Sequence, residues 1–133
     1  MLRAMQKICP VSSPRTLTCA ALLSLLPALP ALASPPEIVG ATAKRAAGGW
    51  NISVTLRHDD GGWEHYADLW EVLDEGGNVL GARKLHHPHV EEQPFTRTLR
   101  QVVVPDGTRK VYIRARCSDG TWSEGRHKLK LTR

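Results

Sequence analysis

The stretch VVVPDGTRKVYIRARC, residues 102–117, decides the fold class of this chain. Its Pro-Asp-Gly segment is typical of a turn, because proline presets one backbone angle and glycine accepts a positive φ. After the turn, every second residue is apolar and tyrosine or arginine stands between: the apolar positions are Val111, Ile113, Ala115 and Cys117. Side chains of a β-strand alternate between its two faces, so this pattern predicts a strand with one buried face.

The same alternation recurs in both directions along the chain, with glycine, proline and aspartate between the segments. In WNISVTLRH, for example, Trp50, Ile52 and Val54 share one side of the expected strand. The expected strands are residues 37–44, 50–58, 65–74, 79–85, 95–105, 110–117 and 126–132. About seven short strands with few helical signals predict an all-β fold, a single antiparallel β-sandwich over residues 34–133.

The rhythm of residues 37–132, and above all the stretch VVVPDGTRKVYIRARCSDGTWS, resembles fibronectin type III and other immunoglobulin-like domains. The resemblance implies a two-sheet sandwich in which Tyr112 matches the family's tyrosine. The paired cysteines of true immunoglobulin domains are absent, since Val54 stands where a partner for Cys117 would be sought.

A second resemblance is carried by HYADLWEVL, VLGARKL and LHHPHVEEQPFTRTL. These segments are similar to those of small uncharacterised exported bacterial proteins with an HPHV-x-EQPFTR-like segment. That resemblance implies an exported sandwich and no mechanism.

The first 33 residues have the features of a secretory signal peptide. A positively charged start precedes an uncharged apolar run over residues 17–33, and the run ends in Ala-Leu-Ala, which a signal peptidase accepts. A membrane anchor fits less well, because Pro27 and Pro30 interrupt the run, and the apolar stretch follows Cys19 rather than preceding it as in a lipoprotein. We therefore expect cleavage before Ser34 and a periplasmic or secreted domain with no transmembrane span.

The charge of the chain is +5, from 18 basic and 13 acidic residues. Three basic residues lie in the expected signal peptide, which leaves 15 against 13 in the mature chain. So mild a net charge argues against a nucleic-acid partner. The charge is nevertheless uneven, since residues 34–96 are mainly acidic and residues 97–133 mainly basic.

Cys117 is the one cysteine beyond the expected signal peptide, so no disulfide can form within the mature domain. Its apolar strand neighbours predict a buried and inert thiol; a nucleophile or an intermolecular disulfide is the alternative. Trp50 and Trp70 fall in strand phase and are candidates for the core, whereas Trp63 and Trp122 lie in glycine-rich loops, as contact residues or as plugs of the core.

All six histidines lie in the expected mature domain. In LHHPHVEEQPF, residues 85–95, proline favours an extended chain, which would place His87 and His89 on one side, with Glu91 on the same side as a possible oxygen donor. Together with His58 or His65 near the Asp-Gly-Gly turn, they are candidate ligands for copper or zinc. The alternative is a structural crossing whose imidazoles bond to backbone carbonyls.

No catalytic motif is recognisable, and we do not expect an enzyme. The first functional hypothesis is an exported binding module for a protein or another envelope component. Its expected contact residues lie in and beside the histidine-rich crossing: His86, Glu92, Gln93, Phe95 and Arg97. The second hypothesis is a periplasmic copper- or zinc-binding protein that uses the histidine loop.

A basic face is the remaining candidate. Arg114 and Arg116 share one side of an expected strand, and Lys128 and Lys130 share one side of the next. If the two strands pair, the four cations suit an anionic partner. The alternative is a solvated face whose charge is neutralised by acids on a neighbouring strand.

Overall fold

The computed structural model describes residues 10–12, 27 and 34–132. The chain separates into two units, Met1–Pro30 and Ala31–Arg133, and the second unit carries all the strands. The predicted signal peptide falls almost wholly outside the described residues. Among the residues described, there is no apolar helix of membrane-spanning length.

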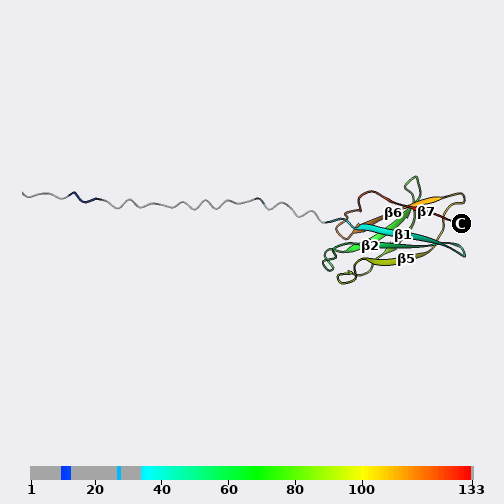
Figure 1. Cartoon of the computed structure of the whole chain (residues 1–133), viewed down its shortest axis with the longest axis horizontal. Coiled ribbons are helices and arrows are strands. Elements are labelled where there is room, and N and C mark those ends of the chain that lie inside the picture. Colours follow the sequence, from blue (N-terminus) through cyan, green and yellow to red (C-terminus); the bar gives the residue numbers. More distant parts are fainter. Residues whose placement is uncertain (1–9, 13–26, 28–33, 133) are drawn as a thin grey trace, which may run out of the picture. The chain divides into compact units, whose positions relative to one another are not determined.

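Seven antiparallel strands form two sheets, which confirms the predicted all-β sandwich (Figure 1). The strands are β1 (Glu37–Ala46), β2 (Gly49–Arg57), β3 (Ala67–Leu73), β4 (Val79–Lys84), β5 (Phe95–Val102), β6 (Lys110–Cys117) and β7 (His127–Lys130). One sheet has the order β1-β2-β5 and the other has the order β4-β3-β6-β7.

The core lies between the sheets and is built from the residues that alternate inward. On β2 these are Trp50, Ile52, Val54 and Leu56, and on β6 they are Val111, Ile113, Ala115 and Cys117, all of them buried. Trp70 of β3 is the largest of the fully buried side chains. The alternation of apolar residues along the sequence therefore correctly predicts the inner face of both strands.

Gly49, the first residue of β2, lies close to the backbone of β5 in the first sheet. A Cβ atom at this position would lie 2.5 Å from the carbonyl oxygen of Val102 on β5. That contact is with backbone, which cannot rotate away, and the β2–β5 register shifts next to it, between Trp50 and Ile52. Only glycine fits here without displacing the edge strand.

We therefore expect Gly49→Ala to lower the free energy of unfolding by about 1–3 kcal/mol, the usual cost of overpacking. Gly40→Ala is the matched control, because nothing lies within 4 Å of a Cβ at Gly40, and a change within about 0.5 kcal/mol is expected there. Urea unfolding of both variants measures the difference. Equal stability of the two would contradict the close approach of β2 and β5.

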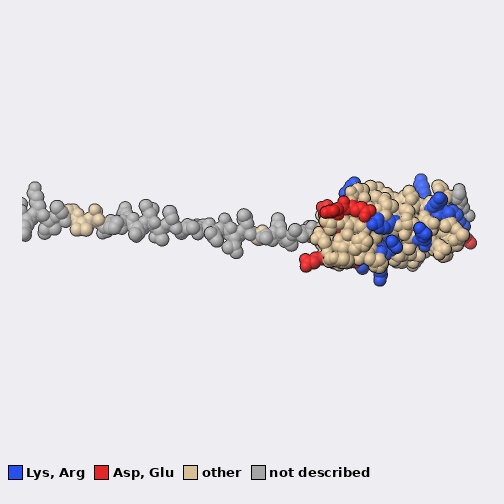
Figure 2. All heavy atoms as spheres, turned by 90° about the horizontal axis from the view of Figure 1, so that it is seen from below, with Lys and Arg blue, Asp and Glu red and all other residues tan. Residues whose placement is uncertain are grey.

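The antiparallel order brings four segments to one end of the sandwich: residues 34–36, 58–66, 85–94 and 118–126. We call this the histidine end, because five of the six histidines lie in these segments. On the face shown in Figure 2, acidic side chains gather at this end and basic ones lie over the rest of the domain. The surroundings of the histidines therefore favour a cation.

Candidate functional site at the histidine end

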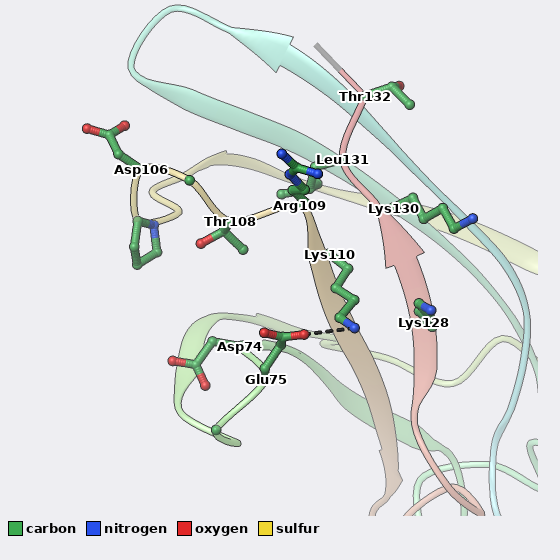
Figure 3. A pocket seen from close by; sticks show the side chains of 13 residues that line it. Asp74, Glu75, Asp106, Thr108, Arg109, Lys110, Lys128, Lys130, Leu131 and Thr132 are labelled. Atoms are coloured by element: carbon green, nitrogen blue, oxygen red, sulfur yellow. Dashed lines mark ion pairs between the residues drawn. The ribbon is translucent and has the colours of Figure 1, made fainter.

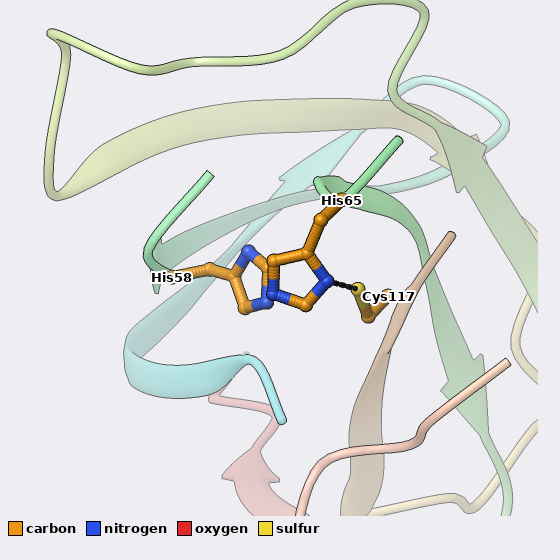
Figure 4. Close-up of side chains that lie close together, drawn as sticks. All are labelled: His58, His65 and Cys117. Atoms are coloured by element: carbon orange, nitrogen blue, oxygen red, sulfur yellow. Dashed lines mark hydrogen bonds between the residues drawn. The ribbon is translucent and has the colours of Figure 1, made fainter. Parts of the chain in front are cut away.

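Three side chains converge at the histidine end: His58, His65 and Cys117 (Figure 4). Each offers one metal-ligating atom, and the three atoms lie within 4.8 Å of one another. His58 and Cys117 are buried, and His65 is partly exposed. The donors come from both sheets, since His58 follows β2 whereas Cys117 ends β6.

The loop of residues 58–66 brings the two histidines together. Its Gly61 and Gly62 let the chain reverse, and the amide of Gly61 donates to the carbonyl of His65 at 2.7 Å. The rings of His58 and His65 lie 4.7 Å apart between centroids. Cys117 joins them because Ala67, two residues after His65, pairs with Cys117 in the β3–β6 register.

Asp60 is the buried carboxylate that orients this loop. Its Oδ1 lies 2.5 Å from Nδ1 of His58 and accepts the amide of Ala67 at 3.0 Å. Its Oδ2 accepts the amide of His89 at 2.7 Å. The Asp60 side chain is inaccessible to solvent, so its charge is compensated by these donors. One carboxylate thus ties the loop after β2 to the crossing that contains His89.

The second nitrogen of His58 is held by the start of the domain. Nε2 donates to the carbonyl of Ser34 at 3.0 Å. Pro36, two residues further on, is fully buried and packs this segment onto the sandwich. Since Nδ1 faces Asp60, Nε2 is the atom with which His58 would ligate a metal.

Cys117 lies against His65, with 3.2 Å between its sulfur and Nδ1 of the ring. Burial raises the pKa of the Cys117 thiol, because the thiolate would lose its hydration. The carboxylate of Asp119 lies 4.0 Å from the same ring nitrogen. Its pKa is lowered, chiefly by the backbone amide of Thr121, so it remains an anion beside the cluster.

Two imidazoles and a thiolate are a donor set for zinc or copper. A ligating histidine in proteins is usually oriented by a carboxylate on its other nitrogen, and Asp60 occupies that position for His58. The group therefore has the ligands and the supporting hydrogen bond of a metal site.

His87 and His89 lie together, as the sequence predicted, with 4.6 Å between ring centroids. The structure does not bring them into the donor group, in which Cys117 stands beside His58 and His65. His89 is buried and stacks on Phe95 at 3.9 Å, and its Nε2 accepts a hydrogen bond from Arg97 at 2.9 Å. Its pKa is lowered by burial and by the charge of Arg97, so the ring is a neutral structural histidine.

Most of the expected contact residues in and beside residues 85–95 already make contacts within the protein. Gln93 accepts the amide of His58 and donates to the carbonyl of His89. Arg97 pairs with Glu92 at 3.2 Å. Phe95 is buried under His89 and is not available to a partner. His86 is exposed, as a contact residue would be.

The predicted basic face divides into two parts. Arg114 pairs with Glu71 and Arg116 pairs with Asp68, each at 2.8 Å. The β3–β6 register places Arg114 opposite Glu71 and Arg116 opposite Leu69, the neighbour of Asp68. Arg114 also stacks over Trp122 at 4.1 Å. The two arginines are therefore neutralised by a neighbouring strand, as in the alternative drawn from the sequence.

Lys128 and Lys130 are exposed on β7. They line an open hollow of about 1200 Å³ at the opposite end of the sandwich (Figure 3). Three acids also line it, and Glu75 pairs with Lys110 at 2.8 Å: the acids are Asp74, Glu75 and Asp106. The hollow consequently has nearly balanced charge.

Cys117 is the member of the site that sequence reasoning missed. Its alternation within β6 correctly predicted that it is buried. The sequence also contained a signal for its place in the site. Cys117 is the last residue of an expected strand, and such a residue lies beside the loops at one end of a sandwich. Which loop it meets depends on the pairing of β6 with β3, and β4 and β5 lie between these two strands along the chain.

A protein of Halomicrobium mukohataei described as "Putative lipoprotein" is 44% identical to this chain over 79 residues. The matched region is 59% of this chain and 38% of that protein, so the chain spans well under half of its relative. No protein-family profile matches the chain, and no solved structure matches it.

Proposed function

We propose that this chain is an exported β-sandwich protein that binds one transition-metal ion, zinc or copper, at the histidine end. The observation that carries the proposal is the convergence of His58, His65 and Cys117, with donor atoms within 4.8 Å of one another. The Asp60 carboxylate on His58 supports it, because such a carboxylate holds the other ring nitrogen toward a metal.

Export is supported by the leader-like residues 1–33 and by the description of the relative as a lipoprotein. We propose an envelope location on that basis. Binding rather than catalysis is supported by the state of Cys117, whose burial and raised pKa disfavour a free thiolate nucleophile.

A protein or envelope partner is the second candidate, and a specific observation favours the same end for it. Trp63 is 68% exposed and Val90 is 58% exposed, and both lie in loops of the histidine end. Exposed aromatic and aliphatic side chains are typical anchors of protein contacts. A partner that docks there would cover the metal site.

The test of the proposed function is zinc binding by the purified full chain after its metal has been removed. We expect one zinc per chain after dialysis, measured by elemental analysis. His65→Ala should weaken binding by more than the ~10–100-fold that loss of a supporting residue costs. The partly exposed ring of His65 makes this substitution milder for the fold than a change at His58.

His86→Ala is the matched control, since His86 is exposed at the same end and lies outside the donor group. It should bind zinc as the unchanged chain does. Failure of the unchanged chain to bind either zinc or copper, or equal losses of zinc in both variants, would overturn the proposed function.

A further inference from the structure

The number of side-chain donors in the site is informative about the metal. The donor group contains two histidines and one cysteine among the described residues. Structural zinc sites are almost always closed by four protein ligands. A trigonal set of two histidines and a cysteine, completed by a weak and long fourth ligand, is instead typical of copper, and a backbone oxygen can serve as that ligand.

A backbone oxygen lies beside one of the three proposed ligands. The carbonyl of Ser34 accepts a hydrogen bond from Nε2 of His58 at 3.0 Å. When His58 ligates a metal, that nitrogen no longer carries a hydrogen, and the carbonyl loses its donor. A cation bonded to Nε2 at about 2.0 Å would replace the hydrogen as the positive partner, and the Ser34 carbonyl is the neighbouring backbone oxygen that could serve as a long contact.

The segment that presents this oxygen is anchored. Pro36 is fully buried, and Pro35 beside it is partly buried. Two successive prolines restrict the backbone that leads back to Ser34. The position of the carbonyl is therefore set by the packing of the domain.

We infer that the site is a copper site, in which His58, His65 and Cys117 are the three strong ligands and the Ser34 carbonyl is the long fourth one. This inference rests on the proposed function, and it assigns the metal and a fourth ligand from the start of the domain. The surroundings agree with it, since the acidic histidine end favours a cation and the buried sulfur is shielded from a second thiol.

The first test adds one equivalent of Cu²⁺ to the metal-free full chain. A copper–thiolate bond gives an intense visible charge-transfer absorption, which we expect to saturate at one copper per chain and to be absent in Cys117→Ser. Zinc binding measured on the same sample separates the two proposals. If zinc binds but copper gives no thiolate absorption band, the copper assignment alone is wrong. If neither metal binds, the proposed function is wrong as well.

The second test loosens the segment that holds Ser34. The double variant Pro35→Gly with Pro36→Gly should weaken copper binding at least tenfold and move the charge-transfer band, while zinc binding changes less than about threefold, by analogy with losses around other metal sites. Pro105→Gly, in the turn between β5 and β6 at the opposite end, is the matched control and should leave the band in place.

Circular dichroism establishes that the double variant keeps its strands. Pro35→Gly alone replaces it if they are lost, because Pro35 is only partly buried. A folded variant with an unchanged band and unchanged copper affinity would remove the Ser34 carbonyl from the ligand set.

Discussion

Asp60→Asn should cost the domain about 3–5 kcal/mol of unfolding free energy, the usual result of breaking a buried charged pair. The two oxygens of Asp60 accept from three donors: His58 Nδ1, the amide of Ala67 and the amide of His89. An asparagine has one acceptor oxygen, so its amide nitrogen must face a donor on one side or the other. No water can relieve the conflict, because the side chain is inaccessible to solvent.

Chemical unfolding of Asp60→Asn and Asp59→Asn measures this effect. Asp59 is the exposed neighbour, and its substitution should change the stability by less than about 0.5 kcal/mol. A loss of 3–5 kcal/mol is a large share of the ~5–15 kcal/mol that stabilises a typical domain. If both variants unfold at the same denaturant concentration, Asp60 does not organise the histidine end.

Zinc affinity of the unchanged chain should fall about 100-fold between about pH 8 and about pH 6 from the Cys117 thiol alone. The metal binds the thiolate, so each bound ion displaces the thiol proton, and the apparent affinity falls about tenfold per pH unit below the thiol pKa. Burial raises that pKa. The dependence of zinc affinity on pH therefore continues above about pH 8.5, where an exposed thiol would be largely deprotonated.

In the metal-free chain, the free energy of unfolding should change with pH in the opposite direction to the zinc affinity. A thiol whose pKa is higher in the folded state than in the unfolded chain contributes less stability as the pH rises above the unfolded value of about 8.5. Competition titrations with a zinc chelator and urea unfolding without metal measure the two trends. Cys117→Ser should remove the contribution of the thiol to both pH dependences, that of zinc affinity and that of stability. A zinc affinity of the unchanged chain that does not change with pH would exclude Cys117 as a ligand.

These expectations depend on one arrangement at the histidine end. Asp60 links His58, which ligates in our proposal, to His89, which does not. His89 in turn is stacked on Phe95 and bonded to Arg97. Through Asp60, the histidine-rich crossing therefore supports the position of His58 in the proposed metal site.

The sequence by itself determined the strands and their inner faces. Alternation is a property of one strand, and a period of two is visible wherever one face is buried. It also placed His87 and His89 on one side of an extended segment, where their rings lie 4.6 Å apart. These features depend only on neighbours within a few residues.

Only the tertiary structure decided what the strands bring together. Cys117 reaches His65 because β6 pairs with β3 in a register that sets Cys117 opposite Ala67. The same strand pairing sets Arg114 against Glu71 and Arg116 beside Asp68, and so neutralises two of the four cations of the expected basic face. Register between distant strands is chosen by the packing of the whole core, and a shift by one residue would turn every side chain to the other face. The chain's local pattern therefore supplied the donors, and the pairing of its sheets selected which of them meet.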